Sequence, residues 1–217
     1  FRSDVVDTTA PYLWTDDEVW GYENAAYRMF VRLTGGIADF TSEACTLDMS
    51  VGERVVDLHP AILHIDDAYR VSDGGKISIL NLNDPQSFGR DDYGKYRSQM
   101  NTNVQGRVDM LVIGRQKHKG EWVNTPAEVD SAQLTIYRLP LGNITEASAS
   151  FDDVDEDHHI YLLDWMKHLA YAKQDAETFD KARSEECGAK FENYCAQVKR
   201  EWARYQHKTR VVAYGGL

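Results

Sequence analysis

The sequence contains few cysteines and no long apolar run, and each absence excludes a class of protein. Its 3 cysteines, Cys45, Cys187 and Cys195, are an odd number and lack the close spacing of a metal site. This favours buried thiols in a reducing compartment such as the cytoplasm over a disulfide framework. No apolar stretch approaches the ~18 residues that a membrane-spanning helix requires, so we expect a soluble globular protein.

Basic residues are scarce as well. The chain has 24 Lys and Arg against 35 Asp and Glu, a net charge of −11, and no segment concentrates basic residues above this background. Proteins that hold DNA through its phosphates need such a concentration. We expect no specific binding of nucleic acid, and acidic segments such as 152–157 and Asp91-Asp92 would let DNA pass without sticking.

Motifs of the common catalytic classes are absent: there is no nucleophile elbow, zinc-protease motif, phosphate-binding loop or dinucleotide-binding motif. The best candidate for a metal site is Asp155 with His158 and His159. Adjacent histidines on a helix point about 100° apart, and acids at a helix start stabilise it without any metal. We therefore expect no catalytic residue, cofactor or metal.

His59 and His64 are a second pair that could bind a metal. Their odd spacing in a strand places them on opposite faces, so we expect one to be buried or interfacial and the other exposed. A metal site is again disfavoured.

An N-terminal helix is indicated by a capping box of Thr15 and Glu18, and Gly35-Gly36 ends it. Its apolar stripe is expected to comprise Val19, Tyr22, Ala26, Met29, Phe30 and Leu33.

Between residues 45 and 140 the apolar period changes to two, which predicts a small antiparallel β domain of about five to seven short strands. "CTLDMSV" and "RVVDLH" flank Gly52-Glu53 and resemble a hairpin, and "SDGG" separates a second pair of strands. Residues 83–107 are polar and rich in turn residues, so we expect an exposed loop that reaches outward.

The C-terminal third predicts two helices and an extended end. One helix contains "YLLDWMKHLAYAKQ", with Ile160, Leu163, Met166 and Ala170 on a stripe. The next runs from about Asp175 to His207, roughly 50 Å, with a possible kink at Gly188. The alternating segment "TRVVAYGGL" follows, and we expect a partner chain to order it.

The predicted fold is α+β: an N-terminal helix and two C-terminal helices, one of them long, with an antiparallel β domain inserted and an extended tail. The expected parts are an N-terminal arm and helix (1–44), a β-rich domain (45–140), a helical hairpin (141–208) and a docking tail (209–217).

This order of elements resembles the head-to-tail adaptor, or connector, proteins of tailed bacteriophages. The features that carry the resemblance are the "IYRLP" strand, the Leu- and Ala-rich helix, the long charged helix and the Arg-Val-Val-Ala-Tyr end. The resemblance covers nearly the whole chain and is one of layout, because no single motif is diagnostic.

The resemblance implies a structural virion protein, made in the host cytoplasm, that forms a ring of roughly twelve copies at the head–tail junction. The ring would join the portal protein to a downstream tail or nozzle protein and line the DNA exit channel. The portal would receive a docking tail made of Arg210, Val211, Val212, Ala213, Tyr214, Gly215, Gly216 and Leu217. Neighbouring copies would meet through the aromatic residues Tyr22, Trp165, Phe191, Trp202 and Tyr205.

Two alternatives remain open at this stage. Another phage junction protein, such as a stopper, tail terminator or tail attachment protein, would be richer in β structure. A metal-dependent enzyme would use His158, His159 and Asp155. The sequence also begins at Phe1 without a methionine, so we expect residues before it.

Overall fold

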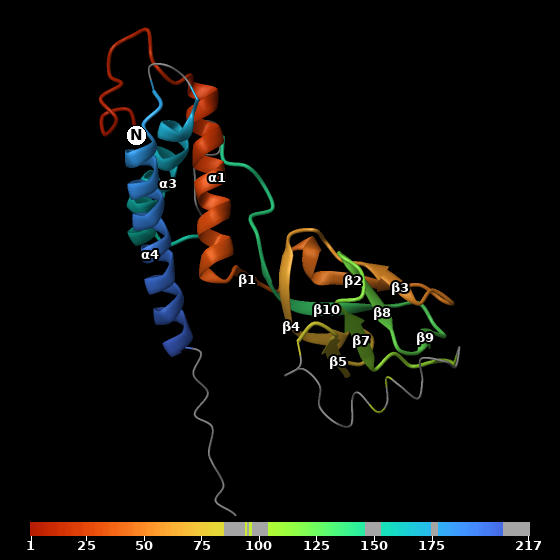
Figure 1. Ribbon diagram of the computed structural model, residues 1–217. Helices are drawn as coiled ribbons and strands as arrows, with labels where there is room; N and C mark the ends of the chain where they lie inside the picture. The colour runs from red at the N-terminus through yellow and green to blue at the C-terminus, as the bar shows by residue number, and fades with distance from the viewer. Residues whose placement is uncertain (85–93, 95, 97–103, 146–152, 175–177, 206–217) are drawn as a thin grey trace, which may run out of the picture. The chain divides into compact units, whose positions relative to one another are not determined.

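The computed structural model describes residues 1–84, 94, 96, 104–145, 153–174 and 178–205. The chain divides into two compact units, one of residues 1–35 with 142–217 and the other of residues 36–141. The first unit is helical, and the second is a β unit inserted between its two segments (Figure 1). The predicted α+β class is confirmed. Among the described helices, none combines the length and the apolar character needed to cross a bilayer.

Helix α1, Asp16–Thr34, begins and ends where its capping residues predict. The Thr15 hydroxyl accepts a hydrogen bond from the Glu18 N–H (3.3 Å), and the Glu18 carboxylate accepts one from the Thr15 N–H (2.9 Å). Gly35 ends the helix in the left-handed region at φ 116°. The buried face differs in part from the predicted stripe and consists of Ala26, Tyr27, Phe30 and Val31.

Helices α3, Glu156–Ala172, and α4, Lys181–Tyr205, pack on each other and on α1. The buried residues of α3 are Leu162, Met166 and Ala170, whereas Ile160, which was predicted to share the stripe, is 68% exposed. The long helix is confirmed: α4 has 25 described residues, which corresponds to about 37 Å, although it begins six residues later than predicted. Its buried face comprises Ser184, Gly188, Phe191, Cys195 and Val198.

The N-terminal arm is tied to the helical unit. Buried Asp7 accepts hydrogen bonds from the Leu13 N–H (2.9 Å) and the Arg2 guanidinium (2.8 Å). Lys167 on α3 forms an ion pair with Asp4 (2.7 Å). These contacts order a segment that shows no apolar period in the sequence.

The β unit contains a curled sheet of 8 strands in the order β1-β10-β4-β5-β7-β8-β3, with β2 also paired to β10 (Figure 1). The short helix η1, Glu43–Cys45, leads into β2. A separate 2-stranded sheet pairs β6, Gln105–Gly106, with β9, Thr125–Pro126. The strands of the large sheet are β1 Ile37–Asp39, β2 Thr46–Met49, β3 Val55–Asp57, β4 Ile62–Arg70, β5 Lys76–Asn81, β7 Met110–Ile113, β8 Lys119–Trp122 and β10 Asp130–Arg138.

The predicted hairpin of β2 with β3 is wrong. Leu47 of β2 lies opposite Ala132 of β10, and Val56 of β3 lies opposite Gly120 of β8. Leu47 and Met49 alternate into the core as predicted, but they do so against a strand far along the chain. Burial of this apolar face therefore outweighs the local turn signal at Gly52.

The sheet is mixed, which corrects the predicted antiparallel domain. β4 and β5 pair antiparallel across "SDGG" as predicted, but β5 pairs parallel to β7, with Ile79 opposite Leu111. A parallel pair needs a crossover of a dozen or more residues, and residues 83–107 supply most of it. Most of that segment lies outside the described residues. Tyr96 within it is buried against Leu80 and Met110, so the segment is not wholly an outward loop.

Candidate functional site

The proposed docking tail, Arg210–Leu217, lies outside the described residues, and so does the side chain of Tyr205. Their roles stay predictions. The other four aromatic candidates all lie on the helical unit, where their positions can be compared.

Phe191 is part of the core of the helical unit. Its exposed fraction is 0%, and its ring centroid lies 5.1 Å from that of Trp165 and 6.5 Å from that of Phe30. Its ring therefore presents no surface to a neighbouring copy. Tyr22 and Trp165 are partly buried, so each keeps an exposed edge on this unit.

Trp202 occupies the same stripe of α4 as Phe191 but is 42% exposed. The reason is the length of its partner helices. Tyr194, two turns earlier, still packs on Phe30 near the end of α1 and on His158 near the start of α3. Helix α4 thus continues beyond both partner helices (Figure 1), and its apolar stripe extends with it to Trp202.

A groove lies between α3 and the C-terminal half of α4, with a volume of about 890 Å³. The rings of Tyr161 and Tyr194 stack in it at 3.5 Å between centroids, and burial raises the pKa of Tyr194 to about 12. The rest of its lining is small or polar and includes Ala196, Ala203 and Arg200. Sequence reasoning missed this groove, because Tyr161 and Tyr194 come from different helices.

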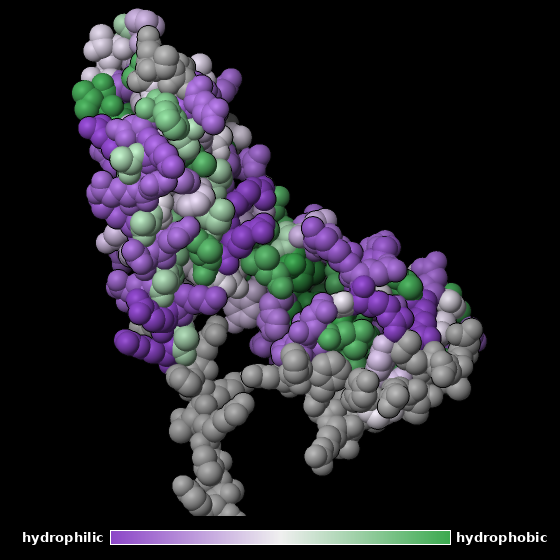
Figure 2. Space-filling model, viewed as in Figure 1, coloured by the Kyte–Doolittle hydropathy of each residue, from purple (hydrophilic) through white to green (hydrophobic). Residues whose placement is uncertain are grey.

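The visible face of α4 is largely hydrophilic, with apolar residues scattered singly (Figure 2). Ion pairs such as Lys190 with Glu186 (2.7 Å) join exposed side chains of α4. This agrees with the predicted charged outer face of the long helix.

The histidine candidates for a metal site are engaged in structural contacts. The Nδ1 atom of His158 is hydrogen-bonded to the Tyr194 hydroxyl (2.8 Å), and Nε2 of His159 donates to the Val154 carbonyl (2.9 Å). No group of three or more potential metal ligands occurs among the described residues. His59 lies partly buried before β4, and His64 lies exposed on it. Because His59 is outside the strand, the predicted placement of the pair on opposite faces of one strand does not apply.

A buried serine and histidine also meet between α3 and α4, and they do not form a catalytic pair. Nδ1 of His168 lies 2.9 Å from the carbonyl oxygen of Ser184, so this nitrogen carries the proton. The Ser184 hydroxyl donates to the His168 carbonyl (2.9 Å). Nδ1 of His168 also lies 3.0 Å from the Ser184 hydroxyl, but because it carries a proton it cannot act as a base toward that hydroxyl.

The cysteines are free thiols, in agreement with the sequence. Cys45 and Cys195 are buried and Cys187 is half-buried. Burial raises the pKa of Cys195 to about 12, so the protonated thiol persists at neutral pH.

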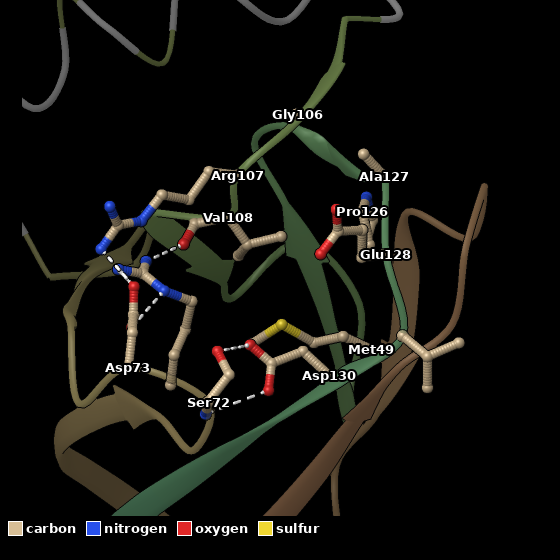
Figure 3. A pocket seen from close by; sticks show the side chains of 12 residues that line it. Met49, Ser72, Asp73, Gly106, Arg107, Val108, Pro126, Ala127, Glu128 and Asp130 are labelled. Atoms are coloured by element: carbon tan, nitrogen blue, oxygen red, sulfur yellow. Dashed lines mark hydrogen bonds and ion pairs between the residues drawn. The ribbon is translucent and has the colours of Figure 1, made fainter.

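A cavity of about 300 Å³ in the β unit holds a network of charged side chains (Figure 3). Asp73 accepts from buried Arg70 (3.0 Å) and forms an ion pair with Arg107 (2.6 Å). Asp130 accepts from the Ser72 hydroxyl (2.7 Å). Hydrogen bonding to Arg70 lowers the pKa of Asp73. Asp73 is paired with two arginines and Asp130 is held by Ser72, and we assign no ligand to this cavity.

Comparison with known proteins agrees with a structural role. No curated protein matches the chain. A family model described as SU10 adaptor protein matches residues 2–213, which is nearly the whole chain. The chain therefore belongs to the SU10 adaptor protein family, the virion adaptors that connect the head and the tail of a phage.

Proposed function

We propose that this adaptor assembles as a ring of roughly twelve copies that joins the portal to the tail and surrounds the path of the DNA. The observation that carries the proposal is the stripe of α4 that continues past α1 and α3 to exposed Trp202. A ring built head to tail requires two different complementary patches on each subunit, and large aromatic side chains anchor such contacts. We assign Trp202 to this contact, together with Tyr22 and Trp165 and, from sequence alone, Tyr205.

The portal would bind the C-terminal tail. In the sequence, Val211 and Ala213 alternate with Val212 and Tyr214, which suits addition as a strand to the edge of a partner's sheet. Gly215-Gly216 permits a tight turn at the end. A tail or nozzle protein would bind the opposite side of the ring.

The net charge of −11 supports passage of DNA through the ring without sequence-specific binding. A predominantly acidic surface repels phosphates and keeps the genome from adhering along its length.

Electron microscopy and native mass spectrometry of the chain with the portal of the same phage would test the proposal. We expect a ring on the portal for the full chain. Deletion of residues 211–217 should abolish portal binding while the circular dichroism of the helices stays unchanged. A chain that remains monomeric in the presence of the portal, at any concentration, would count decisively against this function.

A further inference from the structure

One cavity of the β unit has a volume of about 400 Å³, and the ionisable side chains among the described residues that line it are all basic. The connection between β3 and β4 contributes His59, β4 contributes His64, and the β7–β8 hairpin contributes the other basic residues. Together these basic residues are His59, His64, Arg115, Lys117, His118 and Lys119. Four of them lie within residues 115–119, a short basic segment that the expectation of no basic cluster overlooked, and the fold adds His59 and His64 to it.

Backbone contacts hold the two segments together. The Leu58 N–H donates to the His118 carbonyl (2.9 Å), next to His59. The Asn83 side chain donates to the Gly114 carbonyl (3.0 Å) at the start of the hairpin loop. Gly114 has φ 94°, and a Cβ there would meet the Asn81 side chain at 2.8 Å. The basic side chains therefore project from an ordered framework.

Two carboxylates outside the lining partly balance these charges. Arg115 pairs with Glu121 (3.1 Å) and Lys119 with Asp57 (2.6 Å). Within the described part of the chain, no ion pair joins Lys117 or the three histidines to a carboxylate. The cavity thus keeps an excess of positive charge in a chain whose net charge is −11.

We propose that this basic cavity binds phosphate groups of the DNA backbone as the genome passes the adaptor, an inference that rests on the proposed function. Lysine, arginine and histidine side chains around an open cavity can approach one phosphate from several directions. Such contacts carry no base information, so binding is independent of sequence. The acidic remainder of the chain keeps each contact weak, and DNA can move on.

The test measures binding of a short fluorescein-labelled DNA duplex to the full chain by anisotropy, over a series of salt concentrations. Lys117→Gln should weaken binding and lower the slope of log K against log salt by about one, because one phosphate contact is lost. Lys76→Gln is the matched control, since Lys76 is an exposed lysine of the same unit outside the cavity. It should change neither affinity nor slope.

Two further measurements make the result decisive. Addition of the duplex should shift the NMR signals of His59, His64 and His118 in wild type and shift them less in Lys117→Gln. Polyglutamate should compete poorly, and a polyglutamate that displaces the duplex readily would overturn the assignment in favour of an acidic protein partner. Equal effects of the Lys117 and Lys76 substitutions would also overturn it.

The test of DNA binding by the cavity can fail independently of the test of ring assembly. If the chain forms rings on the portal but does not bind the duplex, phosphate binding by the cavity is contradicted and the proposed ring assembly is supported. If the chain binds the duplex through Lys117 yet stays monomeric, the proposed ring assembly is contradicted and phosphate binding by the cavity is supported.

Discussion

Asp39 and Arg138 form a buried ion pair that joins β1 to β10. The Arg138 guanidinium donates to one carboxylate oxygen of Asp39, and the Thr41 N–H donates to the other (2.9 Å). Burial alone would raise the pKa of Asp39, but hydrogen bonds from Arg138, Ser42 and Thr41 outweigh it and hold the pKa far below its usual range. The carboxylate is therefore charged in the fold and depends on its partners.

We expect Asp39→Ala to destabilise the protein by about 3–5 kcal/mol, because it leaves Arg138 as an uncompensated buried charge. Urea unfolding followed by circular dichroism measures this. Asp67→Ala is the matched control: it breaks the exposed pair with Lys76 (2.6 Å) and should cost much less, since water screens that pair. Equal losses would mean that the Asp39 pair has no special role.

The lowered pKa of Asp39 predicts that acid reduces the stability of the fold. Because the pKa of Asp39 is lower in the folded chain than in the unfolded one, its contribution is complete above about pH 4 and declines as the pH falls further. The difference in stability between wild type and Asp39→Ala should shrink below that pH. A difference that stayed constant down to about pH 3 would contradict the assignment.

At the scale of elements, two helical glycines serve different purposes. Gly21 is exposed in α1, and a Cβ there would meet nothing within 4 Å. Gly188 is buried in α4, and a Cβ there would lie 3.0 Å from Nδ1 of His168. Hydrogen bonds to Ser184 fix that ring, so Gly188 permits the close approach of α3 and α4. The structure thus explains this glycine by packing against α3.

Gly21→Ala should raise the free energy of unfolding by about 0.5–1 kcal/mol, because alanine is the better helix former. Gly188→Ala gains the same intrinsic propensity but must displace His168, and we expect a net loss of stability. Urea unfolding of the two variants side by side measures the contrast. If both substitutions stabilised the protein equally, the close packing at Gly188 would be refuted.

How far sequence predicted these elements depends on the range of the interaction. Thr15 and Gly35 set the ends of α1 through contacts within a few residues, so they could be recognised directly. The partner of β2 could not, because Leu47 pairs with Ala132 and the nearby turn at Gly52 offered a plausible local alternative. The parallel pairing of β5 with β7 could not be recognised either, because these two strands are also far apart in the sequence.

For the whole molecule, the order of the elements was sufficient to predict a head–tail adaptor, and the family match confirms it. The exposed residues of α4 could not be identified in this way, because Phe191 and Trp202 share one stripe and look equivalent in sequence. Only the lengths of α1 and α3 decide which of them is covered. The groove at Tyr161 and Tyr194 likewise required two helices to be placed together.

Because Phe191 is buried and Trp202 is exposed, we expect Phe191 to stabilise the fold and Trp202 to stabilise the assembled ring. Phe191→Ala should cost about 3–5 kcal/mol in the free energy of unfolding, because it empties a fully buried site. Trp202→Ala should leave that free energy nearly unchanged and instead lower the fraction of assembled rings in native mass spectrometry. Phe179→Ala is the matched control, since Phe179 is 54% exposed but precedes α4 and should affect neither quantity. If Trp202→Ala assembled as readily as wild type, the exposed end of the α4 stripe would not be part of the contact between copies.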